Sequence, residues 1–325
     1  FYRSSLVISF KTMNMTFTTA HQSFIDHCKF EKNLSDKTIE FYEIDLKQFQ
    51  SFLKSNNLSY QVSEIDKFAL KGYLKRLSHF KPKTIKRKLA TLKALFNFLE
   101  FEDIIPFNPF RKLRVKIKEP QVLPTLMNAY EVRKIFKAAY TAKEQLTASD
   151  ANYLIRVRDV AVLELLFATG VRVSELCDLK DQNINLHTGV ISIYGKGSKE
   201  RLIQVCNADV LNILREYRSH FEEAIRACGF FFINRLGKRL SDQSIRGLIR
   251  RYTQLAAIDK NITPHTFRHT FATLLLEEDV DIKYIQHFLG HSSIATTQIY
   301  THVNSAKQQQ ILSTKHPRNG FEFGS

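Results

Sequence analysis

Apolar residues in the first third of the chain recur with the period of an α-helix. The segment "LSDKTIEFYEIDLKQFQSFLKSN" (34–56) carries five apolar residues that share one helix face: Ile39, Tyr42, Leu46, Phe49 and Leu53. Spacings of three and four residues indicate an amphipathic helix, and Ser35 suits its N-cap. The same period predicts helices over about 66–78 and over 83–101. We therefore expect an all-helical N-terminal domain.

The C-terminal half combines this period with one stretch of period two. The segment "RVRDVAVLELLFATG" (156–170) predicts a helix that ends at Gly170, and 207–227 and 282–289 predict further helices. In contrast, "GVISIYGKGSKERLIQVC" (189–206) alternates apolar and polar residues on both sides of a glycine-bearing turn, which predicts a β-hairpin. The expected fold class is mainly α with a small antiparallel β-sheet in the C-terminal domain.

A proline-rich segment separates these two parts. The stretch "PFNPFRKLRVKIKEPQVLPT" (106–125) holds four of the seven prolines and has no clear period. We interpret it as a linker between a helical domain over 16–105 and a second domain over 126–316 that includes a C-terminal tail. A chain of 325 residues is long enough for two cores. The basic residues of the linker, including Arg114 and Lys116, suit a strap that lies along phosphates.

The charge of the chain indicates a polyanionic partner. The formal net charge is +16, which favours nucleic acid first and an anionic membrane surface second. Residues 71–93 hold nine Lys or Arg and no Asp or Glu. Four of these cations lie off the apolar stripe of the predicted helix over 83–101: Lys83, Lys86, Arg87 and Lys93. We predict that they contact phosphates of double-stranded DNA, although a merely solvated helix face is the alternative.

Other classes of protein are disfavoured. No apolar run approaches the roughly 18 residues that a membrane span needs, and "FYRSSLVISF" does not resemble a signal peptide. The four cysteines form no CxxC pair, so neither a zinc site nor a redox pair is indicated. Acidic residues are scattered without a cluster able to hold Mg²⁺, and no P-loop is present. We expect no cofactor and no metal.

One helix start gathers cations. In "TPHTFRHTFAT", Pro264 suits the first position of a helix, and His265 and Arg268 are three residues apart on one face. The free N–H groups of the first turn attract an anion to the same place. A bound phosphate would offset the repulsion among His265, Arg268 and His269. This segment is the candidate receiving site for a phosphate.

Other candidate residues lie at turns. We expect Arg172 on a turn between two helices, where Glu175 could orient it and Ser174 could cap the second helix. Lys196 lies in the hairpin turn between two glycines, although a lysine there is more often simply solvated.

Two more candidates follow the predicted helix over 282–289. His291 lies in the turn after it, and a short helix beyond carries Tyr300. A lone tyrosine is usually a packing residue. It becomes a useful nucleophile only beside a cationic phosphate clamp and a proton acceptor.

Four motifs occur in order along the chain: "ATGVRVSEL", "GKGSKER", "PHTFRHTFAT" and "LGHSSIATTQIYTHV". With these motifs the chain resembles the tyrosine recombinase (phage integrase) family, and its Xer-like branch most of all. The resemblance covers nearly the whole sequence. The N-terminal helices look like the family's SAM-like core-binding domain, and "HPR" at 316–318 is also similar to Xer proteins.

The resemblance implies a set of catalytic residues that act on one DNA phosphodiester: Arg172, Lys196, His265, Arg268, His291 and Tyr300. Tyr300 would be the nucleophile that forms a 3′-phosphotyrosyl link, with the two arginines and the two histidines around the phosphate. Lys196 would protonate the leaving 5′ oxygen. The implied chemistry needs neither metal nor ATP.

The resemblance also implies an assembly. It implies a two-domain C-shaped clamp on DNA, a homotetramer with or without a paired recombinase, and a Holliday-junction intermediate. The tail "SAKQQQILSTKHPR" is expected to dock onto a neighbouring protomer in a cyclic exchange. The implied location is the bacterial cytoplasm, on the nucleoid.

Several functions stay open at this level. Resolution of chromosome dimers, inversion and integration of mobile elements are all compatible with the motifs. The alternatives from other classes are a type IB topoisomerase-like enzyme, a non-catalytic DNA-binding protein and a metal-dependent nuclease. The helical N-terminal domain and the Xer-like tail disfavour the first, the complete residue set disfavours the second, and the scattered acids disfavour the third.

Overall fold

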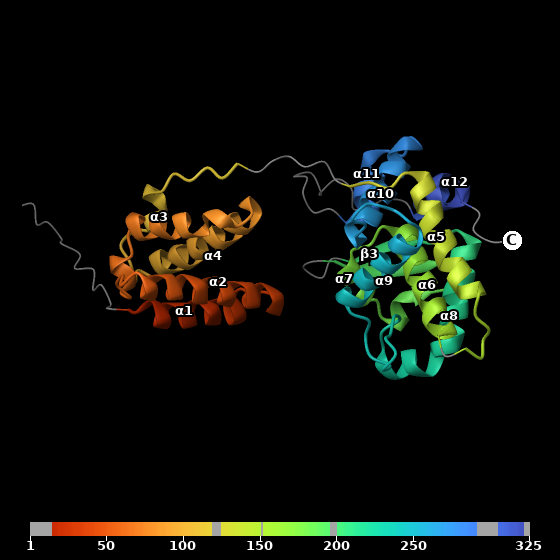
Figure 1. Ribbon diagram of the computed structural model, residues 1–325, viewed down its shortest axis with the longest axis horizontal. Helices are drawn as coiled ribbons and strands as arrows, with labels where there is room; N and C mark the ends of the chain where they lie inside the picture. The colour runs from red at the N-terminus through yellow and green to blue at the C-terminus, as the bar shows by residue number, and fades with distance from the viewer. Residues whose placement is uncertain (1–14, 119–124, 151, 196–199, 291–304, 322–325) are drawn as a thin grey trace, which may run out of the picture. The chain divides into compact units, whose positions relative to one another are not determined.

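The protein forms two compact units, Phe1–Val122 and Leu123–Ser325, each with its own hydrophobic core (Figure 1). The computed structural model describes the following residues: 15–118, 125–150, 152–195, 200–290 and 305–321. Within them the fold is mainly helical with one small antiparallel sheet, as predicted.

The secondary-structure elements in the described part of the N-terminal unit are all helices. Its elements are α1 (Phe17–Asp26), η1 (His27–Glu31), α2 (Asp36–Ser55), η2 (Val62–Glu64), α3 (Lys67–Arg76), η3 (Leu77–His79), α4 (Pro82–Phe101) and η4 (Pro109–Lys112). Ser35 occupies the N-cap position of α2, as predicted, although its side chain caps no backbone N–H. The apolar faces of α1, α2 and α3 meet in an aromatic cluster, where the ring of Phe49 lies 5.3 Å from Phe17 and 4.9 Å from Tyr73. This core fixes the direction in which α4 presents its basic side chains.

The linker begins as part of the N-terminal unit. Leu113, Val115 and Ile117 pack against the core of that unit, while Arg114 and Lys116 between them are exposed. The segment therefore does have a period of two, which the prediction of an aperiodic linker missed. Its apolar side and α4 border a groove of about 290 Å³. The alternation sends successive basic side chains to the solvent, because alternate residues of an extended chain point to opposite sides.

The C-terminal unit is built around one buried helix. Its helices are α5 (Ala129–Glu144), α6 (Tyr153–Thr169), α7 (Val173–Cys177), α8 (Ala208–Cys228), α9 (Asp242–Leu255), α10 (Pro264–Glu277), α11 (Ile282–Leu289) and α12 (Ser305–Lys315), with the short helices η5 (Asp181–Asn183) and η6 (Pro317–Gly320). Helix α6 is apolar on almost every side and packs against α5, α8, α9 and α10. No helix in the described ranges is both long and apolar enough to cross a membrane.

The predicted hairpin forms two of the three strands described. The sheet has the order β1-β2-β3, with β1 (Ile184–Asn185), β2 (Val190–Tyr194) and β3 (Glu200–Gln204) all antiparallel. Tyr194 pairs with Glu200 at the end of the hairpin that leads into the turn. Strand β1 was not predicted, because two residues are too few to show alternation.

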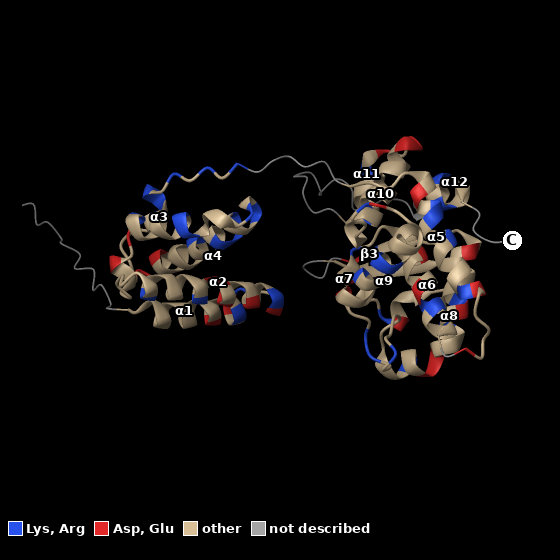
Figure 2. Cartoon of the chain, in the orientation of Figure 1, with Lys and Arg blue, Asp and Glu red and all other residues tan. Residues whose placement is uncertain are grey.

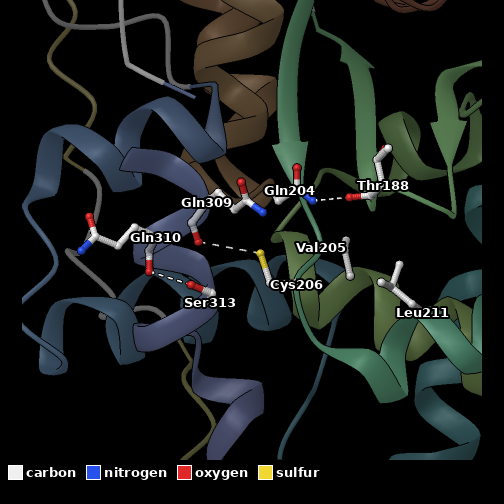
Figure 3. A pocket seen from close by; sticks show the side chains of 8 residues that line it. All are labelled: Thr188, Gln204, Val205, Cys206, Leu211, Gln309, Gln310 and Ser313. Atoms are coloured by element: carbon white, nitrogen blue, oxygen red, sulfur yellow. Dashed lines mark hydrogen bonds between the residues drawn. The ribbon is translucent and has the colours of Figure 1, made fainter. Parts of the chain in front are cut away.

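The C-terminal tail packs on its own chain. Figure 3 shows α12 beside the end of β3, where the Cys206 Sγ lies 3.8 Å from the Gln309 carbonyl oxygen. A cavity of about 470 Å³ remains between the two elements. Beyond α12, the His316 ring hydrogen-bonds the Ala168 carbonyl at 2.7 Å. The tail thus contacts both the small sheet and the central helix α6.

Candidate active site

Helix α10 begins as predicted and places Arg268 in its second turn. Thr263 is the N-cap, and Pro264 takes the first helical position. The Arg268 side chain is 4% exposed. It donates from Nη1 to the Gly170 carbonyl at 2.8 Å and from Nη2 to the Leu289 carbonyl at 2.5 Å. Arg268 therefore joins the C-terminal ends of α6 and α11.

Gly170 makes this approach possible. Its φ of +58° lies in the left-handed region, where α6 stops. A Cβ at this position would lie 2.5 Å from the Phe271 ring, so a larger residue would push α10 away from the turn. The turn also sets the direction of the chain toward Arg172.

Arg172 is held by a carboxylate three residues ahead of it. The Glu175 carboxylate accepts hydrogen bonds from the Arg172 backbone N–H at 2.9 Å and from the Arg172 Nη1 at 2.7 Å, as predicted. The prediction that Ser174 caps α7 is wrong, because Arg172 occupies the N-cap position of this helix. Glu175 accepts the backbone N–H of Arg172, as the third residue of a capping box does. Arg172 also donates from Nη2 to the Gly290 carbonyl at 3.1 Å.

The two arginines converge on the C-terminal end of helix α11. Arg268 and Arg172 donate to the consecutive carbonyls of Leu289 and Gly290. Burial, followed by the charge of Arg172, lowers the pKa of Arg268 to about 10. No described carboxylate forms an ion pair with Arg268. The site thus holds an excess of positive charge that a bidentate oxyanion would neutralise.

His265 lies at the edge of this cluster. It precedes Arg268 by one turn on α10, and its side chain is exposed. Partial burial lowers the pKa of His265, and so do the nearby His269 and the charges of Arg246, Arg268 and Arg172. At neutral pH the ring is therefore mostly neutral and can accept a proton.

Sequence reasoning missed a third arginine. Arg201 on β3 is buried, and its Nη1 and Nη2 donate to the two Glu175 carboxylate oxygens at 3.1 and 2.7 Å. Its Nε donates to the Phe288 carbonyl at 2.9 Å. A signal was available, since Arg201 takes an inward position of the strand between the exposed Glu200 and Leu202. A charged residue on the buried face of a strand requires a partner.

Three of the predicted catalytic residues, Lys196, His291 and Tyr300, lie outside the described residues. The structure does describe the elements next to two of them. Lys196 belongs to the turn between β2 and β3, and His291 directly follows Gly290, which ends α11 with φ +61°.

The basic residues of α4 divide into two groups. Lys83, Lys86 and Lys93 are exposed, and Figure 2 shows cations along α4 and along the first part of the linker. Arg87 is half-buried and donates to the fully buried Asp45 at 2.5 Å. Lys88 donates to the other oxygen of Asp45 at 3.0 Å. Part of the predicted phosphate-contacting surface is thus already paired with a carboxylate of α2.

No cluster of His, Cys, Asp or Glu among the described side chains could hold a metal ion.

Comparison with known proteins assigns both units. Residues 127–307 match the Phage integrase family, and residues 22–103 match the Phage integrase N-terminal SAM-like domain. A tyrosine recombinase of Agathobacter rectalis is 49% identical over 93% of this chain and 97% of that protein. Tyrosine recombinase XerC of Natranaerobius thermophilus is 34% identical over 91% of this chain and 97% of that protein.

Solved structures share the fold. The XerH site-specific recombinase bound to palindromic difH substrate, in a post-cleavage complex, aligns with a TM-score of 0.67 at 24% identity and covers 90% of this chain and 84% of that one. A lambda integrase tetramer bound to a Holliday junction aligns with a TM-score of 0.64 at 20% identity, covering 89% and 78%.

Proposed function

The chain belongs to the phage integrase family of tyrosine recombinases, and on this premise we propose that its arginine cluster and the adjoining segments form one active site for DNA strand exchange. The protein is a DNA-cleaving and rejoining enzyme of site-specific recombination.

The convergence of Arg172 and Arg268 carries the proposal. The two guanidinium groups are held by adjacent carbonyls at the C-terminal end of α11. Arg268 has no carboxylate partner among the described residues. Such a pair can neutralise the non-bridging oxygens of a phosphodiester, where negative charge builds up during in-line displacement. Because the donors are fixed before DNA binds, little reorganisation is needed in the transition state.

Tyr300 is the proposed nucleophile. Its phenolic oxygen attacks the scissile phosphorus, the bond from phosphorus to the 5′ oxygen breaks, and a 3′-phosphotyrosyl ester forms. The phenolic proton passes to the neutral ring of His265. Lys196 gives a proton to the departing 5′ oxygen, and His291 donates a hydrogen bond to the phosphate. Reversal of the same steps by a 5′-hydroxyl of another strand rejoins the DNA.

The N-terminal unit supplies affinity in this proposal. Exposed Lys83, Lys86 and Lys93 of α4 contact phosphates, and Arg114 and Lys116 of the linker extend the row. Arg87 contributes less to this surface than its charge suggests, because it is paired with Asp45. Contacts of this kind position the duplex without reading its sequence.

The active assembly in this proposal is a homotetramer on DNA, in the bacterial cytoplasm. The lambda integrase neighbour is a tetramer bound to a Holliday junction, which supports this arrangement. Exchange of the C-terminal tail between protomers would use the surface that the tail covers on its own chain, formed by β3 and α6.

A covalent trap tests the proposal. The protein is incubated with fragmented genomic DNA in EDTA and denatured, and the attached DNA is recovered and sequenced. We expect attached DNA with the natural chain and with Tyr130→Phe, a control at an exposed tyrosine of α5. Tyr300→Phe should abolish attachment while retaining DNA binding. Attachment that persists in Tyr300→Phe would assign the nucleophile elsewhere.

A further inference from the structure

Arg201 connects three segments of the active site although it was not among the expected residues. It lies on β3, one strand of the hairpin whose turn carries Lys196. Its guanidinium reaches Glu175 on α7 and the Phe288 carbonyl at the end of α11. The end of α11 fits closely around it, since a Cβ at Gly290 would lie 2.9 Å from the Arg201 Nη1.

Glu175 is the link from Arg201 to the phosphate clamp. The carboxylate is buried, and burial acts to raise its pKa, but the hydrogen bonds and charge of Arg201 and the hydrogen bonds of Arg172 outweigh this effect and lower the pKa. The group is therefore ionised and shared by two cations. Arg201 engages both carboxylate oxygens, whereas the Arg172 side chain bonds to Oε1 alone. Arg201 thus sets the plane of the carboxylate on which Arg172 rests.

We propose that Arg201 is a positioning residue for strand cleavage, which orients the Arg172 guanidinium through Glu175 and fixes the end of α11 from which His291 follows. The inference rests on the proposed function of the arginine cluster. Arg201 does not touch the reacting atoms. Its absence would leave Glu175 to Arg172 alone, and the carboxylate could then rotate and draw the guanidinium away from the phosphate.

The geometry requires arginine. The guanidinium fork donates in one plane from Nη1 and Nη2 to the carboxylate and from Nε to the carbonyl. A lysine keeps the charge but is a point donor on a flexible stem, so it cannot fix the plane of Glu175 and reach Phe288 at once. Arg201→Lys therefore separates the orienting role from the simple presence of a positive charge.

The test compares Arg201→Lys with Arg158→Lys. Arg158 is another largely buried arginine, whose Nη2 lies 3.1 Å from the buried Asp159 on α6, and neither residue bonds to Arg172 or Glu175. The probe is a synthetic duplex with the sequence recovered by covalent capture, made once with a normal scissile phosphate and once with a neutral methylphosphonate there. Dissociation constants and single-turnover cleavage rates are measured for both duplexes.

We expect Arg201→Lys to bind both duplexes like the natural chain but to cleave the phosphate duplex about 10–100-fold more slowly, less than the ~10²–10³ typical of a direct donor. The methylphosphonate has no charge for the clamp to neutralise. On that duplex the cleavage rates of the natural chain and of Arg201→Lys should therefore differ by no more than about threefold. Arg158→Lys should cleave both duplexes like the natural chain.

Other outcomes overturn the inference. Unchanged cleavage of the phosphate duplex by Arg201→Lys, or an equal loss on both duplexes, would exclude orientation of the clamp. Loss of DNA binding together with cleavage would mean that Arg201 serves only the fold. Absence of a covalent product with the natural chain would instead overturn the proposed function itself, so the two failures are distinct.

Discussion

Two buried arginines of the C-terminal unit have opposite surroundings. Arg268 is 4% exposed and Arg318 is 1% exposed, so both are removed from water. Arg318 donates to both carboxylate oxygens of the fully buried Glu164, at 2.9 Å from Nε and 3.0 Å from Nη2. Burial acts to lower the pKa of Arg318, but Glu164 outweighs it and the pKa is raised. For Arg268 the pKa is lowered to about 10.

The difference distinguishes a structural cation from a functional one. A buried charge with a bidentate partner can hold two elements together, here the tail and α6. A buried charge that meets only carbonyls beside another cation is destabilising on its own, and folded proteins keep such arrangements at functional sites. Arg268 is therefore best satisfied by an external anion, while Arg318 already has its partner.

The largest expected effect follows from breaking the satisfied pair. Arg318→Met leaves the Glu164 carboxylate buried with only Tyr140 as a donor among its described side-chain partners. We expect the free energy of unfolding to fall by about 3–5 kcal/mol, as for other broken buried ion pairs. Urea unfolding followed by circular dichroism measures the change.

A double variant separates charge from packing. Arg318→Met combined with Glu164→Gln removes the buried charge and should recover much of the lost stability. If the single substitution cost less than about 1 kcal/mol, the tail would not be anchored by this ion pair.

The second effect is on catalysis. Arg268→Met removes one donor of the clamp, and we expect the rate of covalent attachment to fall by about 10²–10³-fold. The free energy of unfolding should stay the same or rise, because an uncompensated buried charge is removed. Single-turnover cleavage and urea unfolding together should show a loss of activity without a loss of stability. Arg318→Met, in contrast, is expected to lose stability. Loss of stability with intact cleavage would contradict the assignment of Arg268.

Local patterns predicted most of the fold. The helices over 34–56 and 83–101 and the hairpin were visible because their apolar periods repeat over many residues. The bond between Glu175 and Arg172 was also predictable, since three residues along a helix start place the two side chains together.

Pairs that are distant in sequence were not predictable in this way. Arg318 and Glu164 are 154 residues apart, and Arg201 and Glu175 are 26 apart. Only packing of the elements brings them together, and no local period encodes it. Sequence reasoning therefore found the residues that we propose to face the phosphate but not Arg201, which we propose to orient Arg172.

A third prediction concerns the pH dependence of the tail. Burial lowers the pKa of His316 to about 4, while its hydrogen bond to the Ala168 carbonyl acts in the opposite direction. Between pH 6.5 and 4 the unfolded chain binds a proton that the folded chain does not, so stability falls as the pH falls. The loss should approach about 3 kcal/mol at pH 4.

His316→Gln provides the comparison for this effect. The amide can still donate to the Ala168 carbonyl but does not titrate. The slope of unfolding free energy against pH, expressed as a number of bound protons, should therefore be smaller than that of the natural chain by up to one proton in this window. Equal slopes for the two proteins would show that His316 is protonated in the folded state as easily as in the unfolded one.

The smallest effect is expected at the linker. Arg114 and Lys116 are exposed on the side of the segment that faces away from the N-terminal core, so neither should affect folding. If each contacts one phosphate, substitution by serine should reduce the slope of log Kd against log salt by about 0.9 per residue. The control is Arg226→Ser on α8, an exposed arginine paired with Glu222. An equal change of salt slope for Arg226→Ser and Arg114→Ser would mean that the linker acts only through net charge. The contrast between paired and unpaired cations would then be limited to the active site.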